Sequence, residues 1–275
     1  MVINCGPVSE LVEGSSLPNR TALPTRQRAP RPGGGRHRAP VPTSLPSDAP
    51  ILVLVVSGQT DGAPSEIASV VQVDNPQIEV RLASTGSLAE ALPEDRAAVI
   101  VPLLTWPDPA VLGEIGKTVA ATGGDAVITE PLGPHPLLAE ALHIRLAERG
   151  LARADRVRLI NIASPVDAVI VGVSGGPAAV QAAQPTAVLL ASRLTLPVVA
   201  ACLDGEPGLE AAATRLRAAG AQRLAVAPCI IGHEMSAVAL ADAAGAVEAG
   251  CAAPLGAHSL LADLVARAYG SQLAT

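Results

Sequence analysis

One stretch of twelve residues occurs twice in this chain in nearly the same form. PLGPHPLLAEAL runs from residue 131 to 142 and PLGAHSLLADLV from 254 to 265, with a histidine at the same place in each. The two copies begin 123 residues apart. Solenoid proteins repeat every 20–50 residues or so, which is much shorter. The long spacing indicates a duplicated domain instead.

Two further landmarks return in the same order. VSG occupies 56–58 and again 173–175, and VIVPLL at 99–104 is matched by LAVAPCI at 224–230, with Pro102 opposite Pro228. Their offsets, 117 and 126 residues, bracket that of the twelve-residue segment. We therefore predict two related lobes, residues 50–152 and 166–275.

Each half alternates short apolar runs with helical patterns. The run 51–58 is continuously apolar and ends at a glycine, which is typical of a parallel strand buried on both faces. A helical pattern follows over 64–72. The fold class expected is α/β, with two similar lobes, each a four-stranded parallel sheet flanked by helices. The predicted strands are 51–58, 78–84, 97–104 and 126–132, then 167–175, 197–204, 223–231 and 246–252. The predicted helices are 64–72, 87–92, 108–121 and 136–150, then 178–194 (where Pro185 is expected to break the helix), 208–220, 234–245 and 259–270.

Composition narrows the classes of partner. Residues 1–49 are rich in Pro, Arg and Gly and are expected to form a disordered tail. The whole chain carries a net charge of −6 and only 1% aromatic residues, which argues against binding to nucleic acid. No apolar run reaches the roughly 18 residues that a membrane helix needs, so no membrane association and a cytoplasmic location are expected.

Several of these segments together resemble the sirohydrochlorin chelatases, the cobalt- or iron-inserting enzymes of the cobalamin and siroheme pathways. They are LVVSGQTD, VIVPLL, PLGPHPLLAEAL and the closing stretch GAQRLAVAPCIIG with PLGAHSLLADLV. The resemblance spans about residues 50–270 and is to the bilobal, actinobacterial-type form. It implies a tetrapyrrole substrate bound in the cleft between the lobes, Co²⁺ or Fe²⁺ as the metal substrate, and no organic cofactor.

The chain departs from the family at the catalytic positions. Metal insertion needs a ligand for a divalent ion and a base for the pyrrole protons, and imidazole supplies both. The family pattern has a His-Gly pair after the first strand and a second His about eight residues past a Val-Pro. Here Ser57 precedes Gly58 at the first place and Ala110 falls at the second, while Glu114 keeps a carboxylate four residues on.

Other side chains are candidates for the missing roles. His135 and His258 occupy equivalent slots at the starts of two predicted helices, where each either caps its helix or contacts substrate or metal. His233 and Glu234 follow an apolar strand and form either a metal-binding pair or an ordinary helix start. The candidate catalytic residues are thus Ser57, His135 and Glu114, and the candidate metal ligands are His233, Glu234 and His135.

Glycine-rich turns are candidates for binding the substrate's acidic arms. GVSGGP at 172–177 lies between a predicted strand and helix, where backbone N–H groups bind anions. Gly58, Ser174, Gly175 and Gly176 are therefore predicted to bind tetrapyrrole carboxylates, with a plain tight turn as the alternative. Dinucleotide binding is disfavoured because the G-x-G-x-x-G spacing is incomplete and Asp204 is only weakly placed to bind a ribose.

Three functions follow from these observations. The first is a chelatase with a rearranged ligand set, in which Asp61 is a further candidate. The second is a catalytically degenerate relative that binds a tetrapyrrole or metal, or pairs with an active chelatase or with a second copy of itself. The third is a nucleotide-binding regulator that uses the turn at 172–176.

Overall fold

A computed structural model describes residues 49–153, 164–232 and 234–273. The tail predicted over 1–49 therefore lies outside the described residues except for Ala49. Among the helices in the described ranges, none has the length and apolar character needed to cross a membrane.

Residues 49–153, the described part of the first half, contain four strands and four α-helices in alternation, with one short 3-10 helix. Its strands are β1 (Ile51–Val56), β2 (Val80–Ser84), β3 (Ala98–Pro102) and β4 (Ala126–Ile128). Its helices are α1 (Ala63–Asp74), the 3-10 helix η1 (Thr85–Ser87), α2 (Leu88–Ala91), α3 (Pro109–Thr122) and α4 (Pro136–Glu148).

The second half repeats this order. Its strands are β5 (Ala168–Val173), β6 (Val198–Cys202), β7 (Leu224–Pro228) and β8 (Ala249–Cys251). Its helices are α5 (Gly176–Leu194), α6 (Leu209–Ala218), α7 (Ala237–Ala246) and α8 (Ser259–Leu273).

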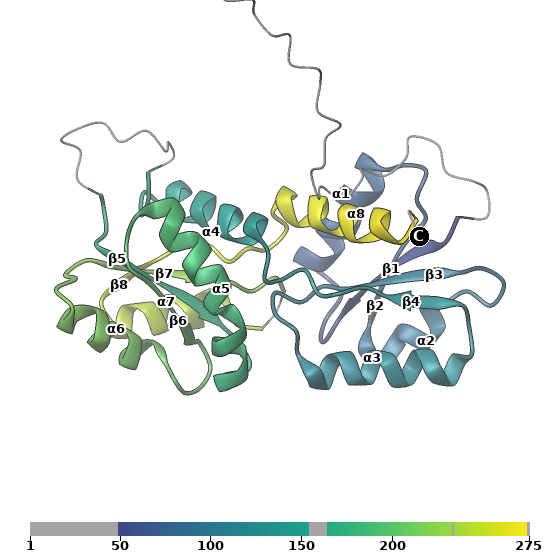
Figure 1. Cartoon of the computed structure of the whole chain (residues 1–275), viewed down its shortest axis with the longest axis horizontal. Coiled ribbons are helices and arrows are strands. Elements are labelled where there is room, and N and C mark those ends of the chain that lie inside the picture. The colour runs from purple at the N-terminus through teal and green to yellow at the C-terminus, as the bar shows by residue number, and fades with distance from the viewer. Residues whose placement is uncertain (1–48, 154–163, 233, 274–275) are drawn as a thin grey trace, which may run out of the picture. The chain divides into compact units, whose positions relative to one another are not determined.

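The strands form two four-stranded parallel sheets with the same topology. Their orders are β2-β1-β3-β4 and β6-β5-β7-β8, and every pairing is parallel (Figure 1). The predicted fold class, two similar lobes with a four-stranded parallel sheet each, is confirmed. The identical strand order is what the duplication inferred from the repeated twelve residues predicts.

The structure corrects some predicted boundaries. α5 continues through Pro185, which lies on an exposed face of the helix, so the lost backbone hydrogen bond does not break it. α7 runs to Ala246 and β8 begins only at Ala249, after Glu248 adopts a left-handed backbone with φ of 48°. The helix predicted over 87–92 is a 3-10 turn followed by a single turn of α-helix.

Alternate residues of the central strands face opposite layers. In β1, Leu52 and Leu54 join a core with Ile67 of α1, whereas Ile51 and Val53 join a separate core under α2 and α3. Figure 1 shows α1 and α8 on one face of the first sheet and α2 and α3 on the other. All six side chains of β1 are buried, which explains its uninterrupted apolar sequence.

The last helix of each half packs on the other half. α8 contacts α1 and β3 of the first half, and α4 contacts α5 and β7 of the second. One core consequently includes residues of both sheets, among them Leu54 and Val171, together with Leu142 of α4 and Val265 of α8. Each sheet is therefore covered in part by a helix from the other half, and the bounds 50–152 and 166–275 stay a prediction.

The repeated PLG..H segments carry the chain across between the lobes. Each lies between the fourth strand of one half and the helix that packs on the other half. His135 Nδ1 accepts a hydrogen bond from the Leu137 amide at the start of α4 (3.1 Å), and His258 Nδ1 accepts one from the Leu260 amide at the start of α8 (3.2 Å). The repeated histidine thus satisfies a free N–H group at the first turn of each exchanged helix.

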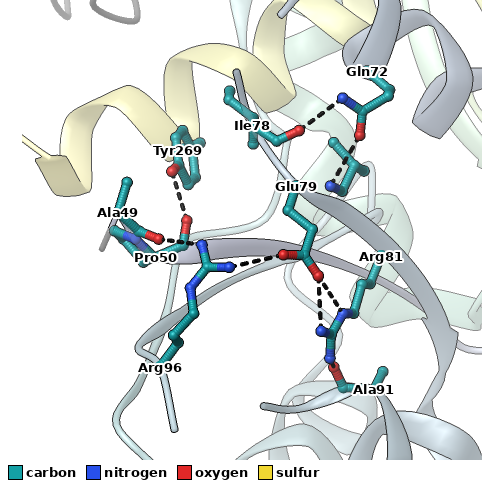
Figure 2. A network of polar contacts seen from close by, with 10 residues as sticks. Ala49, Pro50, Gln72, Ile78, Glu79, Arg81, Ala91, Arg96 and Tyr269 are labelled. Carbon is teal, nitrogen blue, oxygen red and sulfur yellow. Dashed lines mark hydrogen bonds and ion pairs between the residues drawn. The ribbon is translucent and has the colours of Figure 1, made fainter. Parts of the chain in front are cut away.

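A polar network ties α8 to the start of the first sheet (Figure 2). The Tyr269 hydroxyl donates to the Pro50 carbonyl (2.7 Å), and the Arg96 guanidinium donates to the Ala49 carbonyl (2.7 Å). Glu79 accepts from both Arg96 and Arg81 at 2.8 Å. The first of these bonds joins residues that are 219 positions apart. It fixes the exchanged helix at the beginning of β1.

Candidate functional site

A cavity of about 350 Å³ opens at the carboxyl ends of three strands, β1 and β3 of the first sheet and β7 of the second. In parallel α/β folds, ligands bind outside the carboxyl ends of the strands. The volume lies within the range of small-molecule sites, roughly 300–1,000 Å³. The residues that line it are Val56, Ser57, Gly58, Gln59, Pro64, Leu103, Ile231, Gly232 and Glu234.

One wall of the cavity is the loop that follows β1. Ser57, Gly58 and Gln59 all lie exposed at the end of the strand, so a hydroxyl, a backbone and an amide face the opening. Pro64, in the first turn of α1, is buried and closes the wall behind them. A Cβ built on Gly58 would meet no atom within 4 Å, so the space beside this loop is open.

The opposite wall is the loop after β7. Glu234 contributes the only ionisable side chain among the described residues that line the cavity. Its Oε1 accepts a hydrogen bond from the Ile231 amide (3.2 Å), which holds the carboxylate over its own loop. The cavity therefore combines one carboxylate with neutral hydrogen-bonding groups and apolar walls.

A buried thiol lies beneath this second wall. The pKa of the Cys229 thiol is raised to about 12, chiefly by burial; a hydrogen bond involving Thr105 lowers it and the Glu234 charge raises it, and both are smaller effects. At neutral pH this cysteine is a protonated thiol, whereas a metal ligand or nucleophile must be a thiolate. In the metal-free protein Cys229 is therefore a buried neutral thiol and not a nucleophile.

The loop after β5, which corresponds to the Ser57 loop in the second half, has its polar groups occupied by bonds within the protein. Ser174 Oγ donates to the Asp204 carboxylate, which also accepts from Cys202 Sγ (2.8 Å) and, at 3.4 Å, from the Gly175 amide. Burial raises the pKa of Asp204, but the hydrogen bonds from Cys202, Ser174 and Gly175 outweigh it and lower the pKa below its ordinary value. Trp106 of the first half covers the same loop, because its Nε1 donates to the Ser174 carbonyl (3.1 Å).

Only some of the predicted site residues come together. Ser57, Gly58 and Glu234 line the cavity. Ala110 and Glu114 lie exposed on α3 and are not among the lining residues.

Three other groups of predicted site residues lie elsewhere. His135 caps α4 through Nδ1, as described above. Ser174, Gly175 and Gly176 lie in the loop after β5. There the Ser174 hydroxyl and the Gly175 amide donate to the Asp204 carboxylate of the protein itself, where a substrate carboxylate was predicted to accept. His233 lies outside the described residues.

The sequence reasoning missed several residues that shape the site. Gln59, Pro64 and Leu103 line the cavity but were not singled out as site residues, although Gln59 lies in the segment LVVSGQTD and Leu103 in VIVPLL. Their signal was position, since each lies within a few residues of the carboxyl end of a strand or at the start of the helix that follows. Within the described ranges, no group of three or more His, Cys, Asp or Glu side chains is arranged to hold a metal ion.

Comparison with known structures places this fold. SirB from Bacillus subtilis with Fe³⁺ superposes with a TM-score of 0.60 at 12% identity, covering 80% of this chain and 94% of that one. CbiX, described as the terminal enzyme for biosynthesis of siroheme in denitrifying bacteria, gives 0.59 at 18% identity, covering 82% and 99%. The sirohydrochlorin chelatase SirB from Bacillus subtilis subspecies spizizenii in complex with cobalt gives 0.57 at 12% identity, covering 82% and 96%.

The chain therefore has the bilobal fold of the sirohydrochlorin chelatases. No protein-family model matches the sequence, and no curated protein matches it.

Proposed function

We propose that this protein binds a tetrapyrrole in the cavity between β1, β3 and β7 and inserts a divalent metal, Co²⁺ or Fe²⁺, into it. The observation that carries the proposal is the position of the cavity. It lies at the carboxyl ends of strands from both sheets, in a fold shared with structures that are described as sirohydrochlorin chelatases and were determined with iron or cobalt. The metal is a substrate here, and no organic cofactor is required.

The chemistry assigns a task to each polar group of the cavity. Insertion of M²⁺ into the free macrocycle releases two protons from pyrrole nitrogens, so charge is conserved when a base accepts them. Glu234 carries the carboxylate that is placed to accept a proton or to hold the incoming ion, since carboxylate oxygen is a ligand for divalent cations. Ser57 and Gln59 supply neutral hydrogen bonds that orient the macrocycle.

A second function, tetrapyrrole binding without insertion, is favoured by one observation. The two positions at which the family resemblance places histidines hold Ser57 and Ala110, and Ala110 lies outside the cavity lining. A hydroxyl is a poor ligand for these metals at neutral pH and a methyl group is none. On this alternative, the protein would hold a tetrapyrrole or serve as the partner of an active chelatase.

The deciding experiment is anaerobic metal insertion into sirohydrochlorin, followed by absorbance at neutral pH with Co²⁺ or Fe²⁺. We expect turnover by the wild-type protein above the metal-only background. Glu234→Gln should lower the rate by about 10²–10⁴-fold if the carboxylate is the base. The matched control is Glu210→Gln, an exposed carboxylate in the first turn of α6, which should leave the rate unchanged.

The alternative gives a different pattern in the same assay. The wild-type protein would then bind sirohydrochlorin without turnover, and the double variant Ser57→His with Ala110→His would be needed for insertion. If the wild-type protein neither binds nor metallates the macrocycle, both metal insertion and tetrapyrrole binding are excluded.

A further inference from the structure

The segment that follows β3 joins the two walls of the cavity. Thr105 Oγ1 donates a hydrogen bond to the Cys229 carbonyl (2.9 Å). Leu103, two residues before Thr105, lines the cavity on the side of the first half, and Ile231, two residues after Cys229, lines it on the side of the second half. This hydrogen bond therefore connects the two halves of the chain at a point that is two residues from a cavity-lining residue in each half.

Trp106 makes the adjacent connection. Its indole N–H donates to the Ser174 carbonyl (3.1 Å), and its ring packs so closely on the second half that a Cβ on Gly175 would lie 2.5 Å from Cζ2. The loop between β4 and α4 packs directly against Thr105, because a Cβ on Gly133 of that loop would overlap the Thr105 carbonyl oxygen. Two consecutive residues of the first half are thus fixed against two separate loops of the second.

We propose that Thr105 and Trp106 form a clamp, in which Thr105 holds the β7 loop (residues 229–232) and Trp106 holds the loop after β5, and that this clamp fixes the width of the cavity. Both are positioning residues, since neither lines the cavity itself. The inference rests on the proposed function only for its consequence, which is tighter binding of the tetrapyrrole. The clamp itself is a property of the free protein.

Substitution at Thr105 separates the hydrogen bond from packing. Thr105→Val keeps the shape of the side chain but removes the donor, and it leaves the Cys229 carbonyl without this partner. Thr105→Ser keeps the hydroxyl and loses only a methyl group. A role that depends on the hydrogen bond predicts that Ser restores what Val loses, whereas a role in packing alone predicts the reverse.

The test uses nuclear magnetic resonance on the full-length protein without ligand. Trp106 is the only tryptophan, so the spectrum contains one indole N–H resonance, and it reports directly on the bond to Ser174. We expect Thr105→Val to shift this resonance and those of the Ile231 and Gly232 amides and to speed their hydrogen exchange. Thr105→Ser should keep them near their wild-type positions. Unchanged spectra in the Val variant would overturn the clamp.

The consequence for binding is measured separately by titration with a metal-free octacarboxylate porphyrin. We expect the dissociation constant to rise about fivefold in Thr105→Val, because a cavity that is no longer held at its binding width must be ordered when the porphyrin binds, and to return in Thr105→Ser. Altered spectra with an unchanged dissociation constant would overturn the positioning role. Failure of the wild-type protein to bind the porphyrin would count against the proposed function, and the spectra would still decide the clamp.

Discussion

The two VSG loops begin from the same sequence and end in different states. In the first half, Ser57 and Gly58 lie exposed beside a cavity. In the second, Ser174 and Gly175 are bonded to Asp204 and covered by Trp106. The repeat relates the two loops by an offset of 117 residues. A duplicated fold therefore has two equivalent positions for a site and keeps only one of them open.

Two substitutions across the repeat explain the difference. The strand registers pair Val56 with Ser84 and Val173 with Cys202, so that Asp204 of the second half corresponds to Gly86 of the first. The matched prolines Pro102 and Pro228 likewise make Gly232 the counterpart of Trp106. Where Trp106 fills the space over Gly175, Gly232 leaves a cavity beside Ser57.

The largest expected effect tests this contrast at the two glycines. Gly175 has φ of 114° and its Cβ position is occupied by Trp106, whereas Gly58 has open space around it. Gly175→Ala should destabilise the protein by about 2–4 kcal/mol, from backbone strain and overpacking together. Gly58→Ala should cost less than about 0.5 kcal/mol. Urea unfolding measures both, and equal losses would mean that the two loops do not differ as described.

Stability at alkaline pH tests the β7 side of the open site. Cys229 lies there, and it is the counterpart of Leu103 in the repeat. Burial raises the pKa of this thiol from 9.0 to about 12, so the folded protein keeps a proton that the unfolded chain loses. The resulting stabilisation is complete below pH 9 and is lost as the pH rises toward 12. Between pH 9 and about 10.5 the free energy of unfolding should fall by about 2 kcal/mol.

The control for this effect is Cys229→Ala, measured by urea unfolding over the same pH range. The variant has lower stability throughout because of the deleted sulfur, but its additional loss above pH 9 should be smaller than that of the wild-type protein. Parallel pH profiles in the two proteins would show that the Cys229 thiol does not have the raised pKa.

A smaller effect distinguishes the two serines. Ser174 donates to the carboxylate of Asp204, and hydrogen bonds to charged groups contribute about 1.5–3 kcal/mol. Its partial exposure places the expected loss in Ser174→Ala at about 1 kcal/mol. Ser57→Ala, at the exposed loop, should change the unfolding free energy by less than about 0.5 kcal/mol. A comparable loss at both positions would indicate that the Ser57 hydroxyl is also engaged in the folded protein.

The elements and sheets of this fold could be predicted from sequence because its strands are unbroken apolar runs. β1, β3, β5 and β7 each bury every side chain, so they stand out without any periodicity analysis. The exchange of α4 and α8 could not be predicted, because an apolar stripe shows that a helix packs without showing on which sheet. The continuity of α5 through Pro185 was also not predicted, because the sequence does not show that this proline lies on an exposed face of the helix.

The candidate site was predicted in outline and missed in detail. The ends of the strands pointed to Ser57, Gly58 and Glu234, which line one cavity, and their predicted roles stay predictions. The closure of the second loop depends on Asp204 and Trp106, which lie 30 and 68 residues from Ser174. No local pattern links residues so far apart, and only the paired strands bring them together.

The exchanged helix α8 imposes an order on the folding of the protein during its synthesis. The first sheet is the earliest part of the described chain to leave the ribosome, yet the helix that contacts β3 and α1 is the last. Until residues 259–273 emerge, apolar side chains of β1 and β3 on that face lack the cover that α8 provides beside α1. Folding as each domain emerges is the common route for multidomain chains, but here the first lobe must wait for the second.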